Sequence, residues 1–174
     1  KASAVIVGEP STMQPVTAHK AGSGYRLHVV GFEVHSSLMH TGVSAIMSGA
    51  KIIDWAISTN EANSSATPSN LAAMFDPPYT TAHVGTISGG TAGNITAKDC
   101  YFSVDFRVLP DETSSEWYNK LKRKIDAVEQ EMQAVRPETR IDVAQGFFVP
   151  GLRPEAEGKA ETIARQITGD NGTH

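Results

Sequence analysis

The chain has 174 residues, of which 40% are hydrophobic and 20% charged, as is typical of a soluble globular domain. A formal net charge of −4 offers no basic field for nucleic acid or for anionic lipid. No apolar run approaches the ~20 residues that span a membrane, no segment resembles a signal peptide, and the single cysteine, Cys100, excludes an internal disulfide. These features predict a cytoplasmic protein without nucleic-acid or membrane partners.

The chain opens on a short, continuous apolar run, "SAVIVG" (3–8), which is typical of a buried strand in an α/β sheet. Glu9 follows this run directly, and α/β folds bind their ligands at the carboxyl ends of such strands. A surface acid in a loop is the other interpretation of Glu9, and its position alone does not decide. The Pro-, Ser- and Gly-rich stretch that comes next predicts a connector.

Residues 24–147 predict four strands and two helices. Four stretches alternate apolar and polar residues as half-buried strands do, namely "YRLHVVG", "TAHVGTIS", "KDCYFSVDFRV" and "TRIDVAQ". Apolar residues recur at helical spacing over about 43–59. The second helix starts at a capping box formed by Thr113 and Glu116 and ends before Pro137.

The resulting order, β-α-β-β-α-β, predicts an α+β fold of the ferredoxin-like type. Each element has one apolar face, so the set buries itself as a two-layer sandwich, an antiparallel sheet with both helices on one face. The flanking segments are α/β in character and predict a larger α/β domain into which the sandwich is inserted. We therefore divide the chain into 1–17, 18–150 and 151–174, and we expect both ends to continue in a longer polypeptide.

The stretch "GFEVHSSLMHTG" (31–42) places His35 and His40 where a strand gives way to a helix. They could be metal ligands, a proton-transfer pair or ordinary polar residues at a strand end. The chain has no HxxEH or CxxC motif, so no complete metal site can be assembled from local motifs. A nucleophile–base pair of serine and His35 is disfavoured, because no G-x-S-x-G elbow is present.

Two further candidates lie on or beside the strand "KDCYFSVDFRV". Asp105 and Arg107 are predicted on its helix-free face. There they could form a plain ion pair, or Arg107 could bind a carboxylate through its guanidinium fork. Asn94 lies in the Gly-rich stretch "GGTAGNITA", where Asn is typical of a turn.

Together, the phrases "VGEPS", "GFEVHSS", "GGTAGN" and "DFR" resemble the co-catalytic zinc deacylases, in the same order and across nearly the whole chain. Each phrase is weak alone, and the set is specific. In that family a ferredoxin-like dimerisation (lid) domain is inserted in a catalytic α/β domain. The resemblance therefore implies a homodimer formed through the lid domain, acting on a small N-acyl amino acid.

The resemblance also implies roles for four residues. Glu9 would be a ligand of one of two zinc ions per subunit, for which cobalt can substitute. His35 would reach into the partner's active site, hold the substrate carbonyl and stabilise the oxyanion. Asn94 and Arg107 would bind the carboxylate end of the substrate. His40 receives no role.

Several parts of the family's catalytic site are absent from residues 1–174. These are its His-x-Asp ligand pair, its Glu-Glu pair and its late His ligand. The chain by itself is thus expected to hold no zinc and to hydrolyse nothing. Gly93 and Ala97 depart from the family pattern and leave open which acyl group and amino acid are used. Another deacylase or carboxypeptidase of the family, or a non-catalytic ferredoxin-like binding module, are the alternatives.

Overall fold

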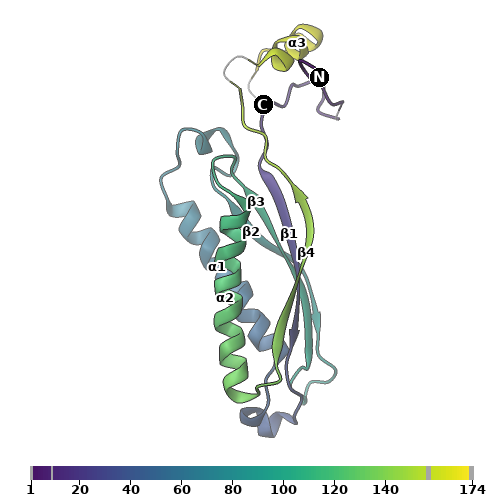
Figure 1. Ribbon diagram of the computed structural model, residues 1–174, viewed down its shortest axis with the longest axis vertical. Coiled ribbons are helices and arrows are strands. Elements are labelled where there is room, and N and C mark those ends of the chain that lie inside the picture. The colour runs from purple at the N-terminus through teal and green to yellow at the C-terminus, as the bar shows by residue number, and fades with distance from the viewer. Residues whose placement is uncertain (1, 9, 156–157, 173–174) are drawn as a thin grey trace.

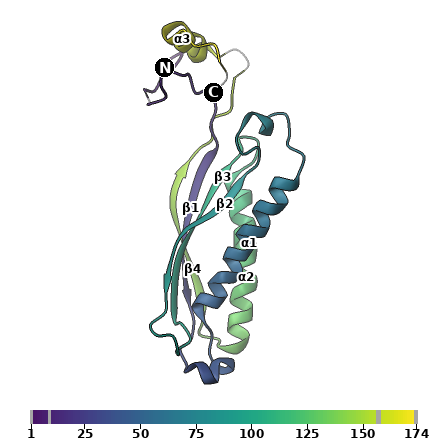
Figure 2. The same cartoon turned by 180° about the vertical axis from the view of Figure 1, so that it is seen from behind.

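The computed structural model describes residues 2–8, 10–155 and 158–172. Its main body is an antiparallel sheet with two long helices against one face (Figures 1 and 2). In chain order the elements are β1 (Ala21–Val30), the 3₁₀ segment η1 (Ser36–Thr41), α1 (Ala45–Ser65), η2 (Ala72–Met74), β2 (Thr81–Gly89), β3 (Asp99–Val108), α2 (Ser114–Val135), β4 (Arg140–Val149) and α3 (Lys159–Thr168).

The four strands lie in the order β2-β3-β1-β4, and each neighbouring pair is antiparallel. β1 and β3 are therefore central, while β2 and β4 are the edges. The sheet and the order of its elements confirm the predicted ferredoxin-like α+β fold. The predicted capping box of Thr113 and Glu116 is also present at the start of α2.

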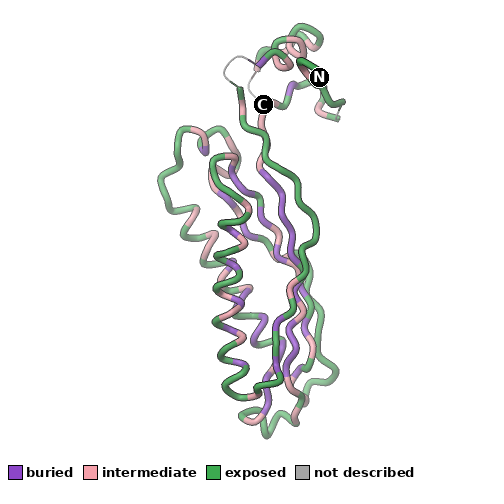
Figure 3. Tube along the Cα trace, in the orientation of Figure 1, coloured by how far each residue is buried: buried purple, intermediate pink, exposed green. Residues whose placement is uncertain are grey.

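The core lies between the sheet and the two helices (Figure 3). The alternation of β3 sends every second side chain into it, and α2 contributes one apolar stripe. The buried residues of these two elements are Cys100, Phe102, Val104, Phe106, Val108, Trp117, Leu121, Ile125, Val128 and Met132. In the part of the chain that the structure describes, no helix is long and apolar enough to cross a membrane.

α1 continues to Ser65, well past the predicted end near residue 59. Two asparagines in its last turns bind the backbone where β2 begins. The amide of Asn60 donates to Ala82 O (2.7 Å) and accepts from Ala82 N (2.8 Å), and Asn63 donates to Thr80 O (2.7 Å). The polar residues that follow the predicted end of the helix therefore form its last turns, which are joined to an edge strand.

Residues 3–8 do not form the predicted strand. Val5, Ile6 and Val7 are all more than half exposed. A strand of this kind is stable only when neighbouring strands pair with it on both sides, and none of the described strands lies beside this segment. The prediction is wrong for the chain as it stands.

The sheet has two distinct ends. At the linker end, β1 starts at Ala21 opposite Val108, and the chain enters and leaves the sandwich. At the other end, β1 finishes at Val30 opposite Asp99. We call residues 31–44 and 90–98, which close this second end, the tip (bottom of Figure 1). Linker end and tip are separated by the full length of β3, about 30 Å.

Candidate functional site

The tip brings His35 and Asn94 together from two separate segments. Residues after β1 turn along the β2–β3 connection, and an isolated bridge pairs His35 with Ile95. The next residue, Ser36, donates its backbone N–H to the Asn94 carbonyl oxygen at 2.8 Å. His35 and Asn94 are both exposed, so their side chains are available to another molecule.

Thr96 fixes the backbone that leads to His35. Its hydroxyl accepts from Val34 N at 2.8 Å and lies 3.0 Å from the Phe32 carbonyl oxygen, to which it donates. Its own N–H donates to the Val34 carbonyl oxygen at 2.9 Å. One threonine thus joins the two segments of the tip immediately beside the histidine.

Arg136, at the end of α2, fastens the tip from the helix side. Its Nε donates to the Thr41 carbonyl oxygen at 2.7 Å, and its guanidinium lies 3.9 Å from the centre of the Phe32 ring. Sequence reasoning did not identify Thr96 or Arg136. Neither lies in a motif, and their partners are distant in the chain, so no local pattern indicates them.

Gly31 is the point where the tip is packed most closely. A Cβ at this position would collide with the Val43 carbonyl oxygen and lie 2.9 Å from Ala97 O and from Ala45 N. All three are backbone atoms, which cannot move aside as a flexible side chain can. Only glycine therefore fits between the end of β1 and the start of α1.

We expect Gly31→Ala to lower the free energy of unfolding by about 2 kcal/mol or more, since overpacking typically costs ~1–3 kcal/mol. Urea denaturation followed by circular dichroism measures it. Gly93→Ala is the matched control, because nothing lies within 4 Å of a Cβ there. Equal midpoints for the two variants would contradict the packing described for Gly31.

The imidazole of His35 is held on one side only. As the N-cap of η1, it accepts at Nδ1 from the Ser37 backbone N–H at 3.3 Å, and Nδ1 lies 2.8 Å from Ser37 Oγ. Within the described part of the chain, Nε2 makes no hydrogen bond. His40, also exposed on η1, lies at the other end of the segment.

Arg107 does not join His35 and Asn94. It lies near the linker end of β3, opposite Gly22. Its Nε is 3.1 Å from Asp105 Oδ1, so the ion pair on the open face is present, and its guanidinium lies 5.7 Å from the centre of the Phe147 ring. Along β3, Arg107 is about 25 Å from the tip.

Glu9, the predicted zinc ligand, lies outside the described residues. Among residues 2–8, 10–155 and 158–172, no three His, Cys, Asp or Glu side chains are arranged to hold a metal ion. The described residues therefore do not fit a zinc site, and we assign no chemical step to a metal that they would hold.

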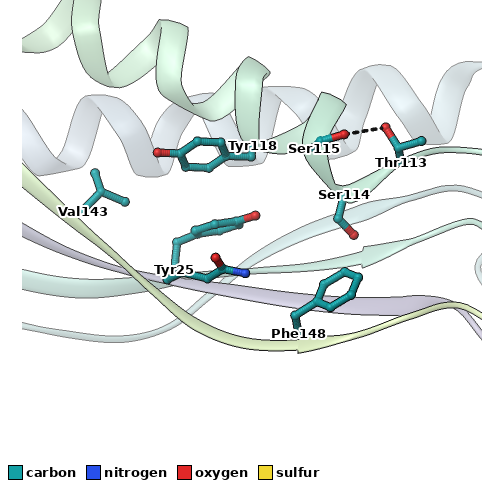
Figure 4. Close-up of a pocket in the computed structure, with 8 residues that line it drawn as sticks. Tyr25, Thr113, Ser114, Ser115, Tyr118, Val143 and Phe148 are labelled. Atoms are coloured by element: carbon teal, nitrogen blue, oxygen red, sulfur yellow. Dashed lines mark hydrogen bonds between the residues drawn. The ribbon is translucent and has the colours of Figure 1, made fainter.

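A pocket of about 560 Å³ lies between the start of α2 and β4 (Figure 4). Tyr25 and Tyr118 stack across it with ring centres 4.8 Å apart, and Ser114 and Phe148 line it further along. Burial raises the pKa of Tyr25 above its usual value. None of the predicted site residues lines this pocket, so it is separate from the tip.

The structure is thus a ferredoxin-like domain with an exposed tip and with β2 at one edge of its sheet. The family model of the peptidase dimerisation domain matches residues 17–133. This match covers more than half of the chain, and the chain belongs to that family.

Several curated relatives are acetylornithine deacetylases. The enzyme of Myxococcus xanthus is 29% identical, over 91% of this chain and 43% of its own length. The enzyme of Yersinia pseudotuberculosis is 32% identical, over 72% of this chain and 31% of its own length. The chain thus spans less than half the length of the curated relatives that it matches.

Solved structures share the fold. An aminopeptidase from Bacillus cereus superposes with a TM-score of 0.64 and 21% identity, covering 91% of this chain and 37% of its own. A tripeptidase from Staphylococcus aureus gives a TM-score of 0.62 and 20% identity, over the same shares. At such identities the likeness establishes the architecture alone.

Proposed function

We propose that this chain is the dimerisation domain of a zinc-dependent amidohydrolase that removes the acyl group from an N-acyl amino acid. The observation that carries this proposal is the exposed tip of a peptidase dimerisation domain, which presents His35 beside Asn94. N-Acetylornithine is the substrate that we propose, with ornithine and acetate as products, as in arginine biosynthesis. The names of the curated relatives and the wording of "VGEPS" and "TGDNGTH" support this choice.

The proposed role of His35 rests on Nε2, the ring nitrogen that makes no hydrogen bond within the described residues. A neutral imidazole with Nδ1 as acceptor carries its proton on Nε2 and can donate it to a carbonyl oxygen. Such a fixed donor stabilises the negative charge that develops on that oxygen during attack on an amide. The tip projects away from the linker end (Figure 1), which is consistent with His35 acting in the active site of the partner subunit.

Arg107 and Asn94 are proposed to bind the carboxylate end of the substrate, for which a guanidinium fork and an amide are suited. About 25 Å separates them along β3 in one chain. An acylated amino acid is far too short to span this gap. The two groups can therefore meet one substrate only if they come from different subunits.

Self-association is proposed to use β2 and α1, which lie at the same side of the sandwich (Figure 2). Asn60 binds the backbone N–H and carbonyl of Ala82 at the start of this edge. Further along β2, no strand of the described residues lies beside its outer edge, so its backbone can pair with a second copy. Ile46, Met47 and Ile57 of α1 and Ile87 of β2 are exposed apolar residues at this side. α1 has few charged residues, namely Lys51, Asp54 and Glu61. α2, which lies on the same face but toward β4 at the other edge of the sheet, is rich in them.

Residues 1–17 and 151–174 are proposed to belong to the catalytic domain, and 18–150 to the dimerisation domain. The two flanking segments lie together beyond the linker end (Figure 3), where Lys159 Nζ donates to Ser3 Oγ at 3.1 Å. Val5, Val7 and Ile167 are exposed there. Apolar side chains of this kind are buried when a catalytic domain completes the packing.

We expect the full-length protein to release acetate from N-acetylornithine, to lose this activity with a chelator, and to recover it with zinc or cobalt. This chain alone should be inactive. Measuring ornithine release by the full-length protein and by the 174-residue chain tests this. Preferential hydrolysis of N-succinyl-diaminopimelate would instead identify a desuccinylase, and no hydrolysis of any N-acyl amino acid would contradict the proposed class.

A further inference from the structure

Two groups of Ser37 converge on a single nitrogen of His35. The backbone N–H of Ser37 donates to Nδ1 at 3.3 Å, and the Ser37 hydroxyl lies 2.8 Å from the same atom. A backbone N–H can only donate, so Nδ1 must present its lone pair and carry no proton. The hydroxyl can then also donate to Nδ1. In the neutral ring, the one proton lies on Nε2, which faces away from Ser37.

We propose that Ser37 is a positioning residue that selects this tautomer and fixes the direction in which Nε2–H points. The inference rests on the proposed function, since it concerns how His35 is prepared to donate to a substrate carbonyl. The hydroxyl contributes more than the backbone N–H because its contact is shorter by half an ångström. A histidine whose second nitrogen is held in this way keeps both its tautomer and its ring orientation.

The remaining contacts of the tip explain why Ser37 can hold the ring. His35 has extended backbone angles, φ −61° and ψ 142°, as an N-cap does, and this places its side chain over the first turn of η1. The Thr96 hydroxyl and the Ser36–Asn94 hydrogen bond fix the backbone on either side. With the main chain fixed, rotation of the imidazole is the freedom that remains, and Ser37 removes it.

Ser36 provides a matched control. Its backbone N–H binds the Asn94 carbonyl oxygen, and an alanine would keep this bond. Its hydroxyl makes no hydrogen bond within the described residues. Both serines are exposed, so neither substitution creates a cavity.

The tautomer is measured by long-range ¹H–¹⁵N correlation spectra of the histidine-labelled 174-residue chain, at a pH where imidazole is neutral. We expect a pyridine-type Nδ1 and a protonated Nε2 for His35. Ser37→Ala keeps the backbone N–H donor but loses the closer hydroxyl, so it should move both signals part of the way toward the tautomeric average. Ser36→Ala and Ser37→Thr should keep them in place. A protonated Nδ1 in the unchanged chain, or identical spectra for Ser37→Ala, would overturn the proposal.

In the full-length enzyme, Ser37→Ala should lower kcat about tenfold with little change in KM, as loss of an orienting partner typically does. Ser37→Thr, which retains the hydroxyl, should restore most of the rate, and Ser36→Ala should be unaffected. An unchanged kcat for Ser37→Ala would overturn the positioning role. Failure of the unchanged enzyme to hydrolyse N-acyl amino acids would count against the proposed function instead, and the spectra would still decide the tautomer.

Discussion

Full-length enzyme carrying His35→Ala is expected to turn over its substrate roughly 10²–10³ times more slowly, the usual cost of losing one oxyanion donor. The His35 side chain is exposed at the tip and packs into no core, so its loss leaves the fold intact. It also lies at the opposite end of the sheet from the linker end, beyond which the described residues 3–8 lie. Steady-state kinetics together with the metal content of the purified protein measure both effects.

His40→Ala is the matched control, since His40 is a second exposed histidine on the same 3₁₀ segment. It should keep kcat within about twofold, because surface changes away from a functional group rarely matter. If His35→Ala instead lost metal while keeping its turnover per bound metal ion, His35 would be a metal ligand, and the oxyanion role would be wrong.

The double variant Ile57→Glu/Ile87→Glu is expected to separate the dimer and to abolish most of the activity. Ile57 is 53% exposed on α1 and Ile87 is 52% exposed on β2. Two carboxylates per subunit buried in an apolar contact would remain unpaired, and this costs several kcal/mol of association energy. Sedimentation velocity of the 174-residue chain and kinetics of the full-length enzyme test the two effects.

Val135→Glu introduces the same charge at the end of α2, where the residue is 47% exposed. This variant should remain a dimer with full activity, because α2 lies toward β4, at the edge of the sheet away from β2. A dimer that persists in the double variant, or one that Val135→Glu dissociates, would move the interface away from β2 and α1.

Local patterns were sufficient to predict the sandwich. The strict alternation of β3 fixes which face is buried, and the one-sided stripe of α2, from Trp117 to Met132, does the same for the helix. The capping box at Thr113 marks the start of α2 within a residue. These signals arise from contacts within one element, so the sequence alone contains them.

What the sequence could not predict depends on contacts between distant segments. The last turns of α1 are polar, and they remain helical beside β2, where Asn60 binds Ala82. Thr96 likewise binds Val34, a residue far from it in the chain, so no local pattern indicates this contact. Conversely, the apolar run 3–8 has no strand beside it and stays exposed. The separation of Arg107 from Asn94 likewise appears only when the strand register is known.

The central claim is that His35 serves the active site of the other subunit, and a mixed dimer tests it most directly. One subunit would carry His35→Ala and the other Glu9→Ala, which removes the proposed zinc ligand. Each variant alone should be inactive. The mixed dimer, purified through two different tags, retains one complete site of two and should show about half the turnover of the unchanged dimer. If the mixed dimer is as inactive as its parents, His35 acts within its own subunit and the account is wrong.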